Sequence, residues 1–124
     1  MAKITLNKLS HSYLTKQNND SDWALRGVDI DWKDGGAYAL LGPSGCGKTT
    51  LLNIISGLLK PTKGEVLFDD KDMTTLNPVE RDIAQIFQFP VIYDTMTVYN
   101  NLAFPLKNRG LSESEIDAKV KEIG

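Results

Sequence analysis

The clearest chemistry in this chain lies in residues 42–49, which read Gly-Pro-Ser-Gly-Cys-Gly-Lys-Thr and fit the pattern G-x-x-x-x-G-K-[ST]. Glycines in such a loop let backbone N–H groups turn inward on a phosphate without obstruction by side chains. Lys48 can then reach the β- and γ-phosphates of a nucleotide, and the Thr49 hydroxyl can ligate Mg²⁺. The pattern therefore predicts a loop that binds nucleotide phosphates together with Mg²⁺.

The residues on either side of the loop predict the elements that position it. Residues 37–41 are apolar without alternation, which is typical of a strand buried on both faces of a parallel sheet. Residues 49–59 carry leucine and isoleucine at helical spacing, and Pro61 marks their end. A strand, a loop and a helix in this order place the positive end of the helix at the loop. This context disfavours the alternative interpretation, a glycine-rich turn with an exposed lysine.

The rest of the chain shows patterns of strands first and of helices later. Ser112 and Glu115 have the spacing of a capping box, and Ile116, Val120 and Ile123 fall on one face of the helix that follows. The remaining expected elements are strands at 4–9, 28–32, 66–68 and 83–87, turns at 34–36 and 69–70, and a short helical or turn stretch around Asn77 and Pro78. A partly exposed loop at 89–96 and a helix capped by Thr97 that runs to residue 106 are expected after them.

Composition narrows the class of protein. Hydrophobic residues make up 41% and charged residues 24%, as in ordinary globular domains. Fourteen basic and sixteen acidic residues give a net charge of −2 without long like-charge blocks, so we expect no nucleic-acid partner. The longest apolar run, residues 37–41, is too short to span a membrane, and residues 1–10 lack the apolar centre of a signal peptide. We expect a soluble, cytosolic chain.

Other candidate residues carry weaker signals. Cys46 is the only cysteine and His11 the only histidine, so neither an internal disulfide nor a metal site built on both residue types can form. Cys46 as a nucleophile lacks a partner base, and its loop position asks only for a small residue. The aromatic residues Tyr13, Trp23 and Trp32 are by default packing residues.

Residues 41–57, followed by Pro61, Gly64, Arg81 and the pair Phe87 and Gln88, resemble the ATP-binding subunit of ABC transporters. Within that family, residues 94–106 resemble importers of the carbohydrate type, and residues 89–93 resemble the glycerol-3-phosphate branch. The resemblance implies an α/β fold of the P-loop NTPase class, with antiparallel strands beside the core. It also implies that residues 1–124 form part of one nucleotide-binding domain. Residues up to about 88 would belong to its core, and the rest to the glutamine loop and the start of a helical subdomain.

The resemblance also implies roles for single residues. It makes Tyr13 the aromatic residue that stacks on adenine, with Trp23 as the alternative. It makes Gln88 the catalytic residue that senses Mg²⁺ and the attacking water, so that Thr49 and Gln88 are the expected metal contacts. The residues expected to contact ATP are Tyr13, Gly42, Pro43, Ser44, Gly45, Cys46, Gly47, Lys48, Thr49 and Thr50.

The family's signature motif, its catalytic glutamate on a second strand and its switch histidine do not occur in this sequence. Glu65 and Glu80 are the carboxylates considered as a base, and their sequence context does not suggest that role. We therefore expect the first part of an ATPase subunit of an importer, which binds Mg-ATP but needs residues beyond the C-terminus for hydrolysis. The implied partners are transmembrane permease subunits and a second ATP-binding subunit, at the cytoplasmic side of the membrane. A non-hydrolytic regulatory module is the alternative, and a small-molecule kinase is disfavoured by Phe87 and Gln88.

Overall fold

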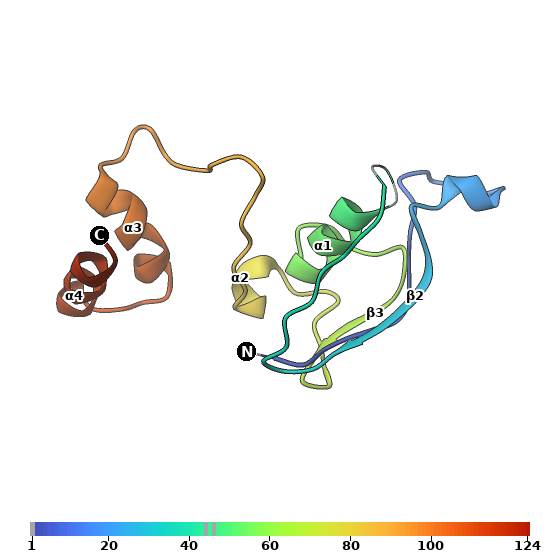
Figure 1. The fold of residues 1–124 in the computed structure, drawn as a ribbon, viewed down its shortest axis with the longest axis horizontal. Helices are drawn as coiled ribbons and strands as arrows, with labels where there is room; N and C mark the ends of the chain where they lie inside the picture. Colours follow the sequence, from blue (N-terminus) through green and yellow to red (C-terminus); the bar gives the residue numbers. More distant parts are fainter. Residues whose placement is uncertain (1, 44, 46) are drawn as a thin grey trace. The chain divides into compact units, whose positions relative to one another are not determined.

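A computed structural model describes residues 2–43, 45 and 47–124 (Figure 1). The chain divides into two compact units, Met1–Gln85 and Ile86–Gly124, and each is described by itself. The assignment of these residues to a core and a helical subdomain stays a prediction.

An antiparallel sheet of four strands in the order β2-β1-β3-β4 forms the first unit's main layer. The strands expected at 4–9, 28–32 and 66–68 are confirmed, each with a longer span than the pattern predicted. The elements of this layer are β1 (Ile4–His11), the short 3-10 helix η1 (Asp20–Asp22), β2 (Leu25–Trp32), β3 (Lys63–Phe68) and β4 (Lys71–Asp72).

A bulge in β1 sets which side chains face the core. Leu6 and Leu9 are both fully buried, although residues three apart in a regular strand point to opposite faces. The pairing of β1 with β2 shifts between these two leucines, and Lys8 has a φ of 46°. This irregularity turns the strand so that both leucines pack inward and β1 runs on to a buried His11.

The helix that follows the glycine-rich loop packs on the sheet (Figure 1). Helix α1 spans Lys48–Ser56 and ends where Gly57 adopts a left-handed conformation with a φ of 90°. It is shorter than the expected 49–59 because Gly57 already terminates it. The buried core of this unit consists of Leu6, Leu9, Leu25, Leu51, Ile54, Ile55, Val66 and Phe68.

Two expected strands are absent from the described residues. Residues 37–41 and 83–87 have no strand conformation, and Leu41 is 91% exposed. The prediction of a strand buried on both faces is therefore wrong for this structure. A strand needs hydrogen-bonding neighbours, and the four described strands pair only with one another.

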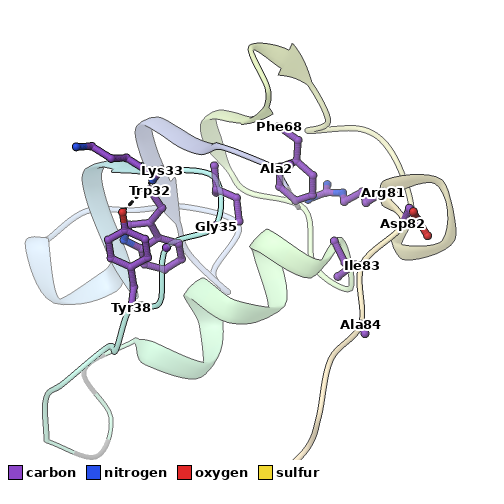
Figure 2. Close-up of a pocket in the computed structure, with 12 residues that line it drawn as sticks. Ala2, Trp32, Lys33, Gly35, Tyr38, Phe68, Arg81, Asp82, Ile83 and Ala84 are labelled. Carbon is purple, nitrogen blue, oxygen red and sulfur yellow. Dashed lines mark hydrogen bonds between the residues drawn. The ribbon is translucent and has the colours of Figure 1, made fainter. Parts of the chain in front are cut away.

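The first unit has a cavity of about 690 Å³ at the end of its sheet (Figure 2). Trp32 and Tyr38 stack on one wall with ring centroids 5.4 Å apart, and the Tyr38 hydroxyl accepts a hydrogen bond from Lys33 N at 3.0 Å. Arg81 and Ile83 lie on the opposite wall. Residues from both segments expected as strands therefore line a cavity rather than the interior of a sheet.

Short turns and helices connect and follow the sheet. Asp69 and Asp70 form the β3–β4 turn with positive φ angles, as expected. Helix α2 spans Pro78–Arg81, so of the two alternatives expected around Asn77, a helical stretch or a turn, the structure has the helix.

The second unit consists of an exposed loop and two helices, α3 (Val98–Asn108) and α4 (Glu113–Ile123). The Thr97 side chain accepts a hydrogen bond from Asn100 N at 3.1 Å, and Ser112 forms the expected capping box. Ile116 and Val120 pack against the buried Ala103, whereas Ile123 is exposed, so the predicted apolar face of α4 is buried at only two of its three positions. No helix among the described residues is long and apolar enough to cross a membrane.

Candidate phosphate-binding site

Glycine is required in the loop before α1 for two separate reasons. Gly45 and Gly47 have φ angles of 81° and 92°, in the left-handed region that side chains with a Cβ avoid. A Cβ on Gly47 would also lie 2.8 Å from the Ala24 carbonyl oxygen and 2.9 Å from the Leu25 side chain. The loop is therefore pressed against the start of β2. Ser44 and Cys46, expected to contact the nucleotide, lie outside the described residues.

The first turn of α1 presents hydrogen-bond donors. Gly47 is the N-cap residue and has no side chain to cap the helix, and the first intrahelical bond runs from Leu51 N to the Gly47 carbonyl at 2.9 Å. The N–H groups of residues 48–50 therefore have no partner within the helix. The Lys48 ammonium group donates to the Gly42 carbonyl, which joins the two ends of the loop. Uncapped N–H groups, the positive end of a helix and a lysine together can hold an anion.

The structure brings Tyr13 to this helix end. Its hydroxyl lies 2.9 Å from the Thr50 hydroxyl, in the first turn of α1, although the two residues are 37 positions apart in the sequence. Its ring packs edge to face against the buried His11, with centroids 4.7 Å apart and planes at 82°. Tyr13 itself is 67% exposed, so most of its surface is open to a ligand. The sequence did not predict the contact between His11 and Tyr13, because a single histidine in a strand carries no signal for such a contact.

Trp23, the alternative aromatic residue, is engaged elsewhere. The Lys63 ammonium group lies 5.2 Å from the centroid of its ring, in a cation–π arrangement. Trp23 is also half-buried, whereas Tyr13 is exposed. One face of the Trp23 ring is therefore occupied.

The other residues predicted from the sequence have no described contact with the loop before α1 or with Tyr13. Gln88 is an exposed residue of the second unit, so its role stays a prediction. Glu80 completes the capping box of α2, where its carboxylate accepts a hydrogen bond from Asn77 N at 3.1 Å. Glu65 is exposed on β3. No group of three or more metal-ligating side chains occurs among the described residues. A metal at Thr49 would therefore need ligands supplied by phosphate oxygens and water.

Comparisons with known proteins place this chain in a family. The family model described as "ABC transporter" matches residues 25–124. An sn-glycerol-3-phosphate import ATP-binding protein of Rhodopseudomonas palustris is 41% identical over 98% of this chain and 32% of its own length. A protein of the same name from Ralstonia nicotianae is 43% identical over the same shares. The chain thus spans about a third of the length of these relatives.

Solved structures show the same likeness. A nucleotide-free ATP-binding cassette from an ABC transporter is 33% identical with a TM-score of 0.71, covering 94% of this chain and 45% of that one. A dimeric ATP-binding cassette in a post-hydrolysis state, bound to ADP and phosphate, is 27% identical with a TM-score of 0.73, over 96% of this chain and 54% of that one. These findings confirm the fold class and the family resemblance that the sequence indicated: the chain belongs to the ABC transporter family.

Proposed function

We propose that this chain is the Mg-ATP-binding part of an ATPase subunit that energises an ABC importer. The observation that carries the proposal is the loop of residues 42–49, closed by Lys48 on Gly42 at the uncapped N-terminus of α1. Glycerol-3-phosphate is the proposed solute, because the curated relatives described above are named for sn-glycerol-3-phosphate import. A sugar is the alternative, because residues 94–106 resemble importers of the carbohydrate type.

The chain's residues fit a nucleotide at three places. The N–H groups of the first turn of α1 and the Lys48 ammonium group suit the phosphates. The exposed Thr49 hydroxyl suits Mg²⁺, which would neutralise phosphate charge when bound. The exposed Tyr13 ring suits the base, and its contact with Thr50 keeps it beside the helix that holds the phosphates.

Replacing Lys48 by alanine tests the phosphate site. The ammonium group of Lys48 should contribute a charge-assisted contact of about 1.5 to 3 kcal/mol, so Lys48→Ala should weaken Mg-ATP binding by about one to two decades. Isothermal titration calorimetry measures the affinity. The matched control is Lys71→Ala, which removes an exposed lysine from β4. Equal ATP affinity of a folded Lys48→Ala variant would contradict the proposal.

A substitution series at Tyr13 tests the base site. Tyr13→Ala should weaken Mg-ATP binding by about 1 to 3 kcal/mol, because base stacking on an aromatic ring has that magnitude. Tyr13→Phe keeps the ring and loses only the contact with Thr50, so its affinity should stay within about fivefold of the wild type. The same titration of Trp23→Ala serves as the comparison. A larger loss for Trp23→Ala than for Tyr13→Ala would assign the base to Trp23.

The finer parts of the proposal concern the whole protein. Gln88 is proposed to sense Mg²⁺ and the attacking water, and permease subunits and a second ATP-binding subunit are the proposed partners. The proposed location is the cytoplasmic side of the membrane, held there by the permease. Import of labelled glycerol-3-phosphate or sugar into cells, abolished by Lys48→Ala, supports this function. Nucleotide binding without any effect on import favours a regulatory module.

A further inference from the structure

Arg81 is a buried cation at the C-terminal end of α1. It is only 4% exposed, and its guanidinium makes four hydrogen bonds, all to backbone carbonyl oxygens. Burial lowers its pKa and the charge of Asp72 raises it, but an arginine stays protonated at neutral pH in either case. A buried charge is costly unless hydrogen bonds compensate for the lost water, and four of the five N–H donors of Arg81 have such a partner.

The partners of Arg81 belong to two segments that the sequence separates. Its Nη1 donates to the carbonyl oxygens of Ile54 and Ile55, in the last turn of α1, at 2.8 and 2.9 Å. Its Nε donates to the Leu76 carbonyl at 2.9 Å, and its Nη2 to the Thr74 carbonyl at 3.3 Å, both in the segment after β4. The planar fork of the guanidinium therefore fastens the end of α1 to the segment between β4 and α2.

Gly57 leaves the room that this arrangement needs. A Cβ on Gly57 would lie 2.8 Å from Arg81 Nε and 3.1 Å from the Leu76 carbonyl oxygen. A second, weaker link runs from Gln85 Nε2 to Asn53 Oδ1 at 3.3 Å. The segment from Arg81 to Gln85 thus holds the C-terminal half of α1 by polar contacts on top of the apolar packing.

The opposite end of α1 carries the proposed nucleotide contacts. Thr50 lies in its first turn, against Tyr13, and Lys48 is its first residue. A nine-residue helix is a rigid rod of about 14 Å, so a tilt at its C-terminal end also shifts its N-terminal end. Lys48 and the phosphate loop would move together with the helix. Tyr13 belongs to the segment after β1, so its hydroxyl contact with Thr50 would lengthen as the helix tilts.

We propose that Arg81 is a positioning residue, which fixes the tilt of α1 and thereby the distance between the phosphate loop and the Tyr13 ring. The inference rests on the proposed Mg-ATP binding. Arg81 lies at the C-terminal end of α1, opposite the end that carries the proposed nucleotide contacts. Its effect reaches ATP only because ATP must contact the loop and the ring at once. A ligand with phosphates but no base does not depend on that distance.

The test compares two ligands, Mg-ATP and Mg-tripolyphosphate, by calorimetry. Arg81→Gln should weaken Mg-ATP binding about tenfold, the size of a lost stacking contact, and leave Mg-tripolyphosphate within about twofold of the wild type. Arg81→Lys keeps the charge without the fork and should weaken Mg-ATP binding by about threefold. The matched control is Arg26→Gln, which removes an exposed arginine on β2 paired with Asp20 at 3.1 Å. It should change neither affinity.

A second measurement reports the geometry without nucleotide. In the wild type and in Arg26→Gln, a nuclear Overhauser effect should connect the Tyr13 ring to the Thr50 methyl group, and it should weaken in Arg81→Gln. The inference is overturned if Arg81→Gln loses the same affinity for Mg-ATP and Mg-tripolyphosphate. It is also overturned if the ratio of these two affinities and the Overhauser effect both stay as in the wild type. If Arg81→Gln does not fold, the ratio of the two affinities measured for Arg81→Lys tests the inference instead. If the wild type binds neither ligand, the proposed function fails, and the Overhauser effect alone decides the role of Arg81.

Discussion

Gly64→Ala is expected to lower the free energy of unfolding by about 3 kcal/mol or more, because the new methyl group would lie less than 3 Å from three backbone atoms of β1. Gly64 has a φ of 93°, and a Cβ there would lie 2.5 Å from the Lys8 carbonyl oxygen, 2.6 Å from that of Asn7 and 2.7 Å from the Leu9 Cα. These contacts sit where β3 pairs with the bulge of β1, so relieving them requires the two strands to separate. Urea or thermal denaturation followed by circular dichroism measures the loss.

Gly35→Ala is the matched control for this variant. Gly35 also has a positive φ, 74°, but a Cβ there would meet no heavy atom within 4 Å. Gly35→Ala should lower the free energy of unfolding by only about 1 kcal/mol, the conformational penalty of an alanine in the left-handed region. Equal losses for the two variants would show that the strands can shift around Gly64, which would contradict the close packing of β3 on the bulge.

The second large effect concerns ATP turnover by the purified chain. We expect the 124-residue chain to release inorganic phosphate from ATP no faster than its Lys48→Ala variant, even where it binds Mg-ATP. Phosphoryl transfer to water needs an oriented water and stabilisation of the developing charge, and the loss of one strong electrostatic group commonly costs a factor of about 10² to 10³. Glu80 is engaged in the capping box of α2, and Glu65 is exposed on β3, so neither is placed as a base by its contacts.

A phosphate-release assay with saturating Mg-ATP makes this measurement. Steady turnover that disappears in Lys48→Ala would show that a base acts beside the loop. Glu65→Gln and Glu80→Gln would then identify it, because only the variant that lacks the base would lose the turnover.

The local elements could be predicted because their signals are local. The glycine-rich loop, the helix after it and the capping box at Ser112 depend on residues within a few positions of one another. A helix closes its hydrogen bonds within one segment, so side chains nearby in the sequence fix its ends. The family could be predicted for the same reason, since its clearest motif is one continuous stretch.

The strands expected at 37–41 and 83–87 show the limit of this reasoning. Their apolar runs indicate burial, but a strand forms only against a neighbouring strand, and no described strand pairs with either segment. Tyr38 and Ile83 from these runs instead line a cavity, and Leu41 is almost fully exposed on the surface. Hydrophobic pattern alone specifies a preference for burial, not the partner that provides it.

The amino-acid sequence was enough to predict the phosphate-binding motif, the family, and the starts of α3 and α4. Three contacts are visible only in the folded chain: Tyr13 meets Thr50, His11 packs against the Tyr13 ring, and Arg81 fastens the end of α1. These contacts join residues 27 or more positions apart in two of the three cases. They depend on the bulge of β1 and on how α1 lies on the sheet, and both follow from packing a core of side chains that no single segment contains.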